Sequence, residues 1–125
     1  MTKYDQCNIF SRIIRGEIPS KMVYQDEFVV AIEDINPAGP VHVLVMPRGE
    51  YTSFDDFVTK APEGLIARFF KTVQRIAEQL GVRESGYRLI ANHGKHASQS
   101  VPHFHVHLIG GRSLGGLVPG DGESR

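Results

Sequence analysis

The sequence predicts an α+β domain in which two main helices pack on one face of a five-stranded antiparallel sheet. Two observations predict this class. A long segment with apolar residues at helical spacing lies between two groups of short segments rich in β-branched residues, and turn-forming residues separate the short segments. The 125 residues are enough to bury one hydrophobic core, and no linker or internal repeat divides the chain. We therefore expect a single domain over residues 1–125.

The N-terminal part of the chain predicts one short helix and three strands. Apolar side chains recur at helical spacing over residues 7–15, and Gly16 and Pro19 then supply a stop signal. Three segments rich in β-branched and apolar residues follow, with turn-forming groups between them. These predicted strands cover residues 22–24, 28–33 and 41–46.

A long amphipathic helix is the most regular feature of the sequence. Residues 47–59 before it are predicted to be irregular or weakly helical. Pro62 then stands at a first helical turn, apolar residues recur with the helical period, and Gly81 marks the end. The helix supplies one complete apolar face to cover a sheet.

Two further strands and a tail complete the chain. Residues 87–91 are predicted to form the fourth strand, and a polar loop over residues 93–100 leads to the fifth strand at residues 101–109. Gly110 and Gly111 close that strand. The glycine-rich tail over residues 113–125 is expected to be loosely ordered unless a partner holds it.

Composition argues against several classes of protein. Fourteen Lys and Arg residues balance fourteen Asp and Glu residues, so no global basic field favours nucleic acid or a membrane surface. A single cysteine, Cys7, excludes an internal disulfide, and no apolar run approaches the roughly 18 residues of a membrane span. The first residues are polar and lack the apolar stretch of a secretory signal, so we expect a cytoplasmic protein.

Three of the six histidines alternate with apolar residues on the predicted fifth strand. Because a strand has a period of two residues, His103, His105 and His107 are expected on one face and the apolar residues between them on the other. A polar outer face would account for one histidine. Three in register indicate a functional site.

Two kinds of chemistry use such a row of imidazoles. A shared metal ion is the less favoured one, because alternate residues on a strand lie about 7 Å apart and no carboxylate lies between Glu84 and Asp121. Covalent catalysis at phosphorus needs a neutral imidazole nitrogen and nearby hydrogen-bond donors. Gln99 and Ser100 offer donors, and His105 is the natural nucleophile. His42 adds a fourth imidazole if its strand lies beside the last one.

The same residues resemble a known family. His103-Phe104-His105-Val106-His107-Leu108-Ile109 looks like the signature of the histidine triad superfamily, and Gly110-Gly111-Arg112 continues as in its Hint branch. The resemblance extends, collinearly, over about residues 7 to 112. It includes residues 9–20, 34–37, 42–47 and 99–102.

This resemblance implies a HIT-like fold whose sheet is extended, edge to edge, across a homodimer. It also implies a hydrolase without a cofactor that cleaves the bond from phosphorus to nitrogen in purine nucleoside 5′-phosphoramidates of the AMP type. The implied intermediate is a nucleotide attached to a histidine.

Matched position by position, His105 resembles the nucleophile, and His103 and His107 resemble residues that orient it and contact phosphate. His42 resembles the fourth histidine, and Asp34 the carboxylate that accepts both ribose hydroxyls. The resemblance further implies an apolar base pocket and polar groups near the phosphate, with Ser100 close to the leaving amine. These residues are Ile9, Phe10, Ile13, Ile32 and Ile35 for the base, and Asn92, Gln99 and Ser100 for the phosphate.

Plainer interpretations stand beside some of these roles. Ile9, Phe10 and Ile13 are also what a helix packed on the core would present. Asp34 is also a typical turn residue before Asn36-Pro37.

Three departures from the family pattern are visible. Some relatives carry Cys-x-x-Cys on the first helix for structural zinc, whereas Asn8 and Ser11 stand there in this chain, so we predict no metal site. Ser98 stands where relatives commonly have glycine. The tail lacks the tryptophan that is often present there, which bears on leaving-group preference.

Other functions remain as alternatives. One is a dinucleoside polyphosphate hydrolase, as in the fragile-histidine-triad branch. A nucleotidyl transferase is disfavoured, because the transferase branch carries glutamine at the position of His107. A nucleotide-binding regulator with little turnover and a metal-binding protein are the alternatives from other classes.

Overall fold

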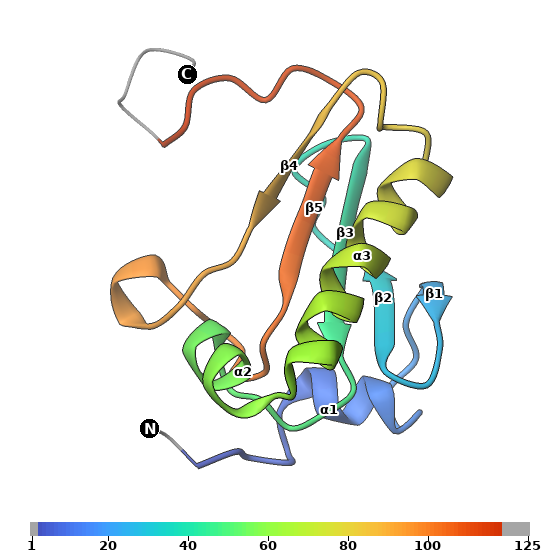
Figure 1. The fold of residues 1–125 in the computed structure, drawn as a ribbon. Helices are drawn as coiled ribbons and strands as arrows, with labels where there is room; N and C mark the ends of the chain where they lie inside the picture. Colours follow the sequence, from blue (N-terminus) through green and yellow to red (C-terminus); the bar gives the residue numbers. More distant parts are fainter. Residues whose placement is uncertain (1–2, 119–125) are drawn as a thin grey trace.

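The computed structural model describes residues 3–118, and part of the predicted tail, residues 119–125, lies outside this range. Figure 1 shows the order of helices and strands along the chain. The elements are α1 (Ile9–Ile14), β1 (Met22–Gln25), β2 (Val29–Glu33), β3 (Val41–Pro47), α2 (Phe54–Lys60), α3 (Glu63–Gln79), β4 (Tyr87–Ile90), the 3₁₀ helix η1 (Lys95–Ala97) and β5 (Val106–Gly110). None of the helices in this range is long and apolar enough to cross a membrane.

One antiparallel sheet holds all five strands in the order β1-β2-β3-β5-β4. The last strand in the sequence, β5, therefore lies between β3 and β4 (Figure 1). In the β3–β5 pair, His42 lies opposite Ile109 and Leu44 lies opposite His107. The prediction of an α+β fold with a five-stranded antiparallel sheet is confirmed, and His42 and His107 come from neighbouring strands.

Helices cover both faces of this sheet. The larger core lies between one face and the helices α2 and α3, and the smaller core lies between the other face and α1. Residues 29–32 of β2 are all buried, because alternate side chains of that strand enter the two cores. The prediction that the helices share one face is therefore wrong for α1. A strand buried on both faces needs a cover on each.

The long helix α3 forms where the apolar period predicts it. Its buried side chains include Phe69, Val73 and Ile76, and Gly81 follows with a φ of +75° that favours glycine. The segment predicted as irregular or weakly helical contains α2, whose N-cap Ser53 accepts a hydrogen bond from the Asp56 N–H.

The fifth strand begins later than the sequence predicts, at Val106 rather than residue 101. The ladder with β3 ends here because Pro47 has no N–H to donate, and the Phe104 N–H instead donates to the Tyr51 carbonyl oxygen at 2.7 Å. The predicted alternation of faces holds nevertheless. Phe104 belongs to the larger core, while the His105 ring packs against Phe10 of the smaller one.

Candidate active site

His105 is held in one tautomer by its own chain. Its Nδ1 lies 2.7 Å from the His103 carbonyl oxygen, which can only accept a hydrogen bond, so Nδ1 carries the proton. The other ring nitrogen, Nε2, keeps its lone pair. Burial lowers the pKa of His105 below the ordinary 6.5, so the ring is neutral at neutral pH. An oriented neutral imidazole with a free nitrogen is what a nucleophile or a general base requires.

His42 sets the tautomer of His107. The Ala38 N–H donates to Nδ1 of His42 at 2.9 Å, which leaves the proton of neutral His42 on Nε2. That Nε2–H lies 2.9 Å from Nδ1 of His107 and donates to it. Since Nδ1 of His107 accepts this hydrogen bond, the single proton of the neutral His107 ring is on Nε2. Burial, with the neighbouring His105 and His42, lowers the pKa of His107 to about 4, so this N–H is a neutral donor.

Asp34 joins the same chain of hydrogen-bonding groups. Its Oδ2 lies 3.3 Å from Nε2 of His42, and its Oδ1 accepts the N–H of Asn36 at 2.8 Å. The contact with Asn36 is typical of a turn residue, which is the plainer role that the sequence suggested for Asp34. Since each carboxylate oxygen can accept more than one hydrogen bond, both oxygens keep capacity for further donors.

His103 has no free ring nitrogen. Its Nε2–H donates to the Pro47 carbonyl oxygen at 2.7 Å, and its Nδ1 accepts from the Tyr4 hydroxyl at 2.6 Å. The side chain is fully buried, and burial lowers the pKa of His103 to about 4. With both nitrogens engaged, His103 can orient its neighbour His105 through the backbone, but in this geometry it offers nothing to a phosphate.

Tyr4 is expected to stabilise this arrangement. Tyr4→Phe keeps the ring but leaves the buried Nδ1 of His103 without a donor, which typically costs about 1–3 kcal/mol. We expect the free energy of unfolding in urea to fall by that amount. Tyr51→Phe is the matched control, because the Tyr51 hydroxyl makes no hydrogen bond within residues 3–118. Equal stabilities of the Tyr4 and Tyr51 variants would contradict the assignment.

An apolar cavity of about 630 Å³ lies between α1 and the strands β2 and β3 of the sheet. Seven of the residues predicted to bind a nucleotide line it, together with others from the segment after α1 and from β3. The predicted ones are Ile9, Phe10, Ile13, Ile32, Asp34, Ile35 and Ser100, and the additional ones are Ile18, Pro19, Ser20, Lys21, Glu33, Leu44 and Val101. Phe10 joins the cavity to the histidines, because its ring meets that of His105 at 4.9 Å between centroids.

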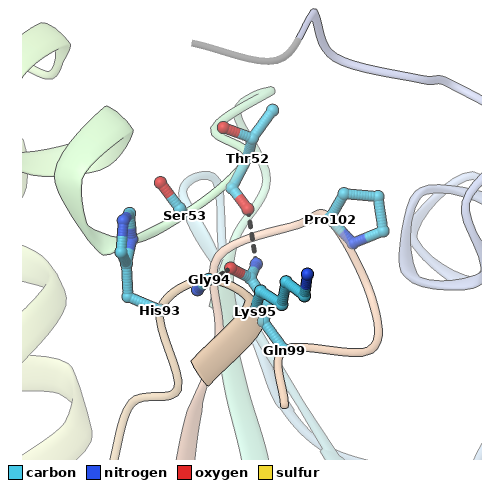
Figure 2. Close-up of a pocket in the computed structure, with 7 residues that line it drawn as sticks. All are labelled: Thr52, Ser53, His93, Gly94, Lys95, Gln99 and Pro102. Carbon is cyan, nitrogen blue, oxygen red and sulfur yellow. Dashed lines mark hydrogen bonds between the residues drawn. The ribbon is translucent and has the colours of Figure 1, made fainter. Parts of the chain in front are cut away.

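A second cavity, of about 610 Å³, lies on the other side of residues 99–102 (Figure 2). Most of its lining residues carry polar groups, although the larger part of the lining surface is apolar, and its walls come from the start of α2 and the loop that contains η1. The lining residues are Thr52, Ser53, His93, Gly94, Lys95, Gln99 and Pro102. Asn92, which was predicted to lie near a phosphate, is half-buried after β4 and lines neither cavity.

Gln99 fixes the loop rather than offering free donors. Its amide nitrogen donates to the Thr52 carbonyl oxygen, and its Oε1 accepts the Gly94 N–H (Figure 2). The same nitrogen also donates to the Val101 carbonyl oxygen. Ser98 has a φ of +58°, the left-handed conformation that favours glycine. The serine thus keeps the backbone path that a glycine would take, at some conformational cost.

The ligand atoms of Asp34, His42 and His107 lie within 4.8 Å of one another, a spacing that a metal ion could bridge. The hydrogen bonds argue against that use, because the Ala38 N–H leaves Nε2 of His42 protonated and unable to ligate. On α1, Asn8 caps the helix by accepting the Ser11 N–H, and the Ser11 hydroxyl accepts from Arg15. Asn8 and Ser11, which stand where some relatives carry zinc-binding cysteines, therefore make hydrogen bonds that stabilise α1.

Sequence reasoning missed Tyr4 and Ala38. Tyr4 reaches a histidine 99 positions away, and Ala38 acts through its backbone, so neither leaves a local pattern. Pro19 and Ser20 of the cavity belong to a segment that the family resemblance had already marked.

Comparison with known proteins shows which family and fold this chain resembles. The family profile for the HIT domain matches residues 15–114. The purine nucleoside phosphoramidase of Escherichia coli (strain K12) is 46% identical over 110 residues, covering 88% of this chain and 92% of that protein. A histidine triad protein from Clostridium difficile superposes with a TM-score of 0.80 at 34% identity, covering 94% of this chain and 100% of the other. A HIT family hydrolase from Clostridium thermocellum is similar with a TM-score of 0.79 at 41% identity, covering 91% of this chain and 98% of the other.

Proposed function

Since this chain belongs to the histidine triad (HIT) family of hydrolases, we propose that it cleaves the phosphorus–nitrogen bond of purine nucleoside 5′-phosphoramidates, with His105 as the nucleophile. The observation that carries the proposal is the single tautomer of His105, with Nδ1–H on the His103 carbonyl oxygen and Nε2 free. The phosphoramidase of Escherichia coli, similar over most of its length, supports the choice of bond.

In the proposal, the apolar cavity holds the nucleoside. Its aliphatic and aromatic lining suits the faces of a flat purine, and the exposed side chains of Ile9 and Ile35 would be covered by the bound base. Asp34 accepts both ribose hydroxyls with its two carboxylate oxygens. Ser100 also lines this cavity and comes three residues before His103 in the sequence, so the proposal puts the phosphate beside it.

The first chemical step forms a bond from Nε2 of His105 to phosphorus. The phosphorus–nitrogen bond breaks, its electron pair goes to the leaving nitrogen, and that nitrogen takes up a proton from solvent beside Ser100. The modified imidazole carries a positive charge, which the His103 carbonyl oxygen stabilises through Nδ1–H. His107 donates its Nε2–H to the phosphoryl oxygens, where negative charge develops.

The second step returns the enzyme to its starting state. A water oxygen attacks phosphorus, the bond to Nε2 breaks with its electron pair returning to the ring, and the proton of the water goes to solvent. The nucleoside monophosphate then leaves. Because the ring is cationic in the intermediate, it is a good leaving group in this step.

The pH dependence should follow His105. A nucleophilic imidazole must be neutral, and burial lowers the pKa of His105 below 6.5. Activity is therefore expected to stay constant as the pH falls toward 6.5 and to decline only below it. The measurement is kcat/KM against pH, with circular dichroism at each pH to confirm that the chain is folded. A decline that begins above about pH 7 would contradict a nucleophile of lowered pKa.

The direct test of the proposed function is release of AMP from adenosine 5′-phosphoramidate by the purified protein. Sustained release that requires His105 supports the proposal. Binding of AMP without any release would favour the nucleotide-binding regulator. Faster cleavage of a dinucleoside polyphosphate than of the phosphoramidate would favour the other hydrolase class.

We further propose that the protein is a homodimer whose sheets join at β4. This strand is one edge of the sheet, and its Leu89 side chain is 45% exposed. An edge strand with an exposed apolar side chain is suited to pair with a second copy.

A further inference from the structure

The carbonyl group that fixes the tautomer of His105 belongs to a residue outside the sheet ladder. Strand β5 pairs with its neighbours only from Val106 onward, so strand pairing does not hold His103 in place. The next residue, Phe104, is held by the bond from its N–H to the Tyr51 carbonyl oxygen. The position of the His103 carbonyl oxygen therefore also depends on what its own side chain contacts.

The His103 ring is held at two points. Its Nδ1 accepts from the Tyr4 hydroxyl at 2.6 Å, and its Nε2–H donates to the Pro47 carbonyl oxygen at 2.7 Å. The Tyr4 ring also meets the His103 ring edge-on, at 5.6 Å between centroids. Partners at two atoms of a fully buried ring restrict its side-chain torsions, and they restrict the backbone that carries the ring as well.

Tyr4 comes from a short segment that has anchors of its own. The Asp5 carbonyl oxygen accepts both the backbone N–H and the side-chain amide of Asn8, which is the N-cap of α1. The Gln6 carbonyl oxygen accepts from the guanidinium of Arg15 at 2.9 Å. These bonds tie the segment to α1 on either side, so the Tyr4 hydroxyl is a fixed donor for the buried ring.

From this geometry we infer that Tyr4 is a positioning residue: its hydroxyl holds His103 so that the His103 carbonyl oxygen stays on Nδ1–H of His105. Its part in catalysis rests on the proposed function. In the first chemical step the His105 ring becomes cationic, and this carbonyl oxygen stabilises the charge through Nδ1–H. A displaced carbonyl oxygen would stabilise the cation less, and it would allow the tautomer in which Nε2 is protonated and cannot attack phosphorus.

The kinetic test uses Tyr4→Phe, which keeps the ring and removes the donor. We expect kcat for release of AMP from adenosine 5′-phosphoramidate to fall by about tenfold, the usual order when a group that orients a functional side chain is lost. KM should stay near the wild-type value, because Tyr4 lines neither cavity. Circular dichroism at the assay temperature confirms that the variant is folded. Tyr51→Phe removes a hydroxyl that makes no hydrogen bond within residues 3–118, and this matched control should keep the wild-type kcat.

Two further measurements separate positioning from stability. Replacing Tyr4 by 4-aminophenylalanine returns a donor to the same place and should recover most of the wild-type kcat. Nitrogen NMR of labelled histidine side chains shows the tautomer of His105 without any substrate, with the signal assigned by its absence from His105→Ala. Wild type should show the Nδ1–H tautomer. Tyr4→Phe should show a larger fraction of the Nε2–H tautomer.

The outcomes that overturn the inference are distinct from those that overturn the proposed function. A Tyr4→Phe enzyme that is less stable but keeps the wild-type kcat and the wild-type tautomer of His105 would refute the inference alone. An equal loss of kcat in Tyr51→Phe, or a loss that 4-aminophenylalanine does not reverse, would also refute it. Failure of wild type to release AMP would refute the proposed function, while the NMR comparison would still decide whether Tyr4 positions His105.

Discussion

Replacing His105 by alanine is expected to lower kcat by about 10⁴-fold or more, because none of the neighbouring imidazoles, those of His42, His103 and His107, has a free nitrogen to form the bond to phosphorus. The alternative nitrogens are engaged elsewhere. Both ring nitrogens of His103 are bonded within the protein, and Nδ1 of His107 accepts from His42. Among the histidines of residues 3–118, His105 alone has a buried, neutral ring whose second nitrogen accepts no hydrogen bond from the protein.

The same variant should bind AMP nearly as well as wild type does. The proposed nucleoside contacts come from α1, β2 and the cavity around them, so the loss should appear in kcat rather than in affinity. Calorimetric titration with AMP and steady-state kinetics measure the two separately. His96→Ala, which removes an exposed histidine of η1, is the matched control and should retain activity. A His105→Ala enzyme with a tenth of wild-type kcat would refute the assignment.

His107→Ala is expected to have the next largest effect, a loss of about 10²- to 10³-fold in kcat. That range is typical when one donor to a developing negative charge is removed. The donor exists because the Ala38 N–H and His42 together place the proton of His107 on Nε2. Burial holds the pKa of His107 at about 4. The ring therefore stays neutral across the neutral pH range and donates through its single N–H.

His42 provides a check on this explanation. His42→Ala leaves the His107 ring in place but removes the donor that fixes its tautomer, so kcat should fall by less than in His107→Ala. The double variant should lose about as much as His107→Ala alone, because both changes remove one interaction. Independent, multiplicative losses would show that His42 does not act through His107.

Much of the fold follows from local pattern. The long helix α3 has an uninterrupted apolar period, and the strands β2 and β3 are rich in β-branched residues, so their positions were predictable to within a few residues. The face of the sheet that α1 covers could not be predicted in this way. An amphipathic segment shows that it has an apolar side, but not which side of the sheet lacks a cover.

The triad segment shows the same limit. Its alternation predicted the two faces correctly, yet the backbone leaves the sheet before Val106, because Pro47 cannot donate to a neighbouring strand. The local pattern also could not separate the three histidines. His103 is bonded by Tyr4 and Pro47, while His105 keeps a free nitrogen, and these differences arise from contacts between distant parts of the chain.

Intact-protein mass spectrometry can detect the proposed covalent intermediate on His105. Wild type and His105→Ala are each mixed with an adenosine phosphoramidate and quenched early without acid, which preserves a bond from phosphorus to histidine. We expect a mass increase equal to one adenylyl group on wild type alone, followed by its loss as AMP appears. An adduct of the same mass on His105→Ala, or AMP released by that variant at the wild-type rate, would contradict covalent catalysis by His105.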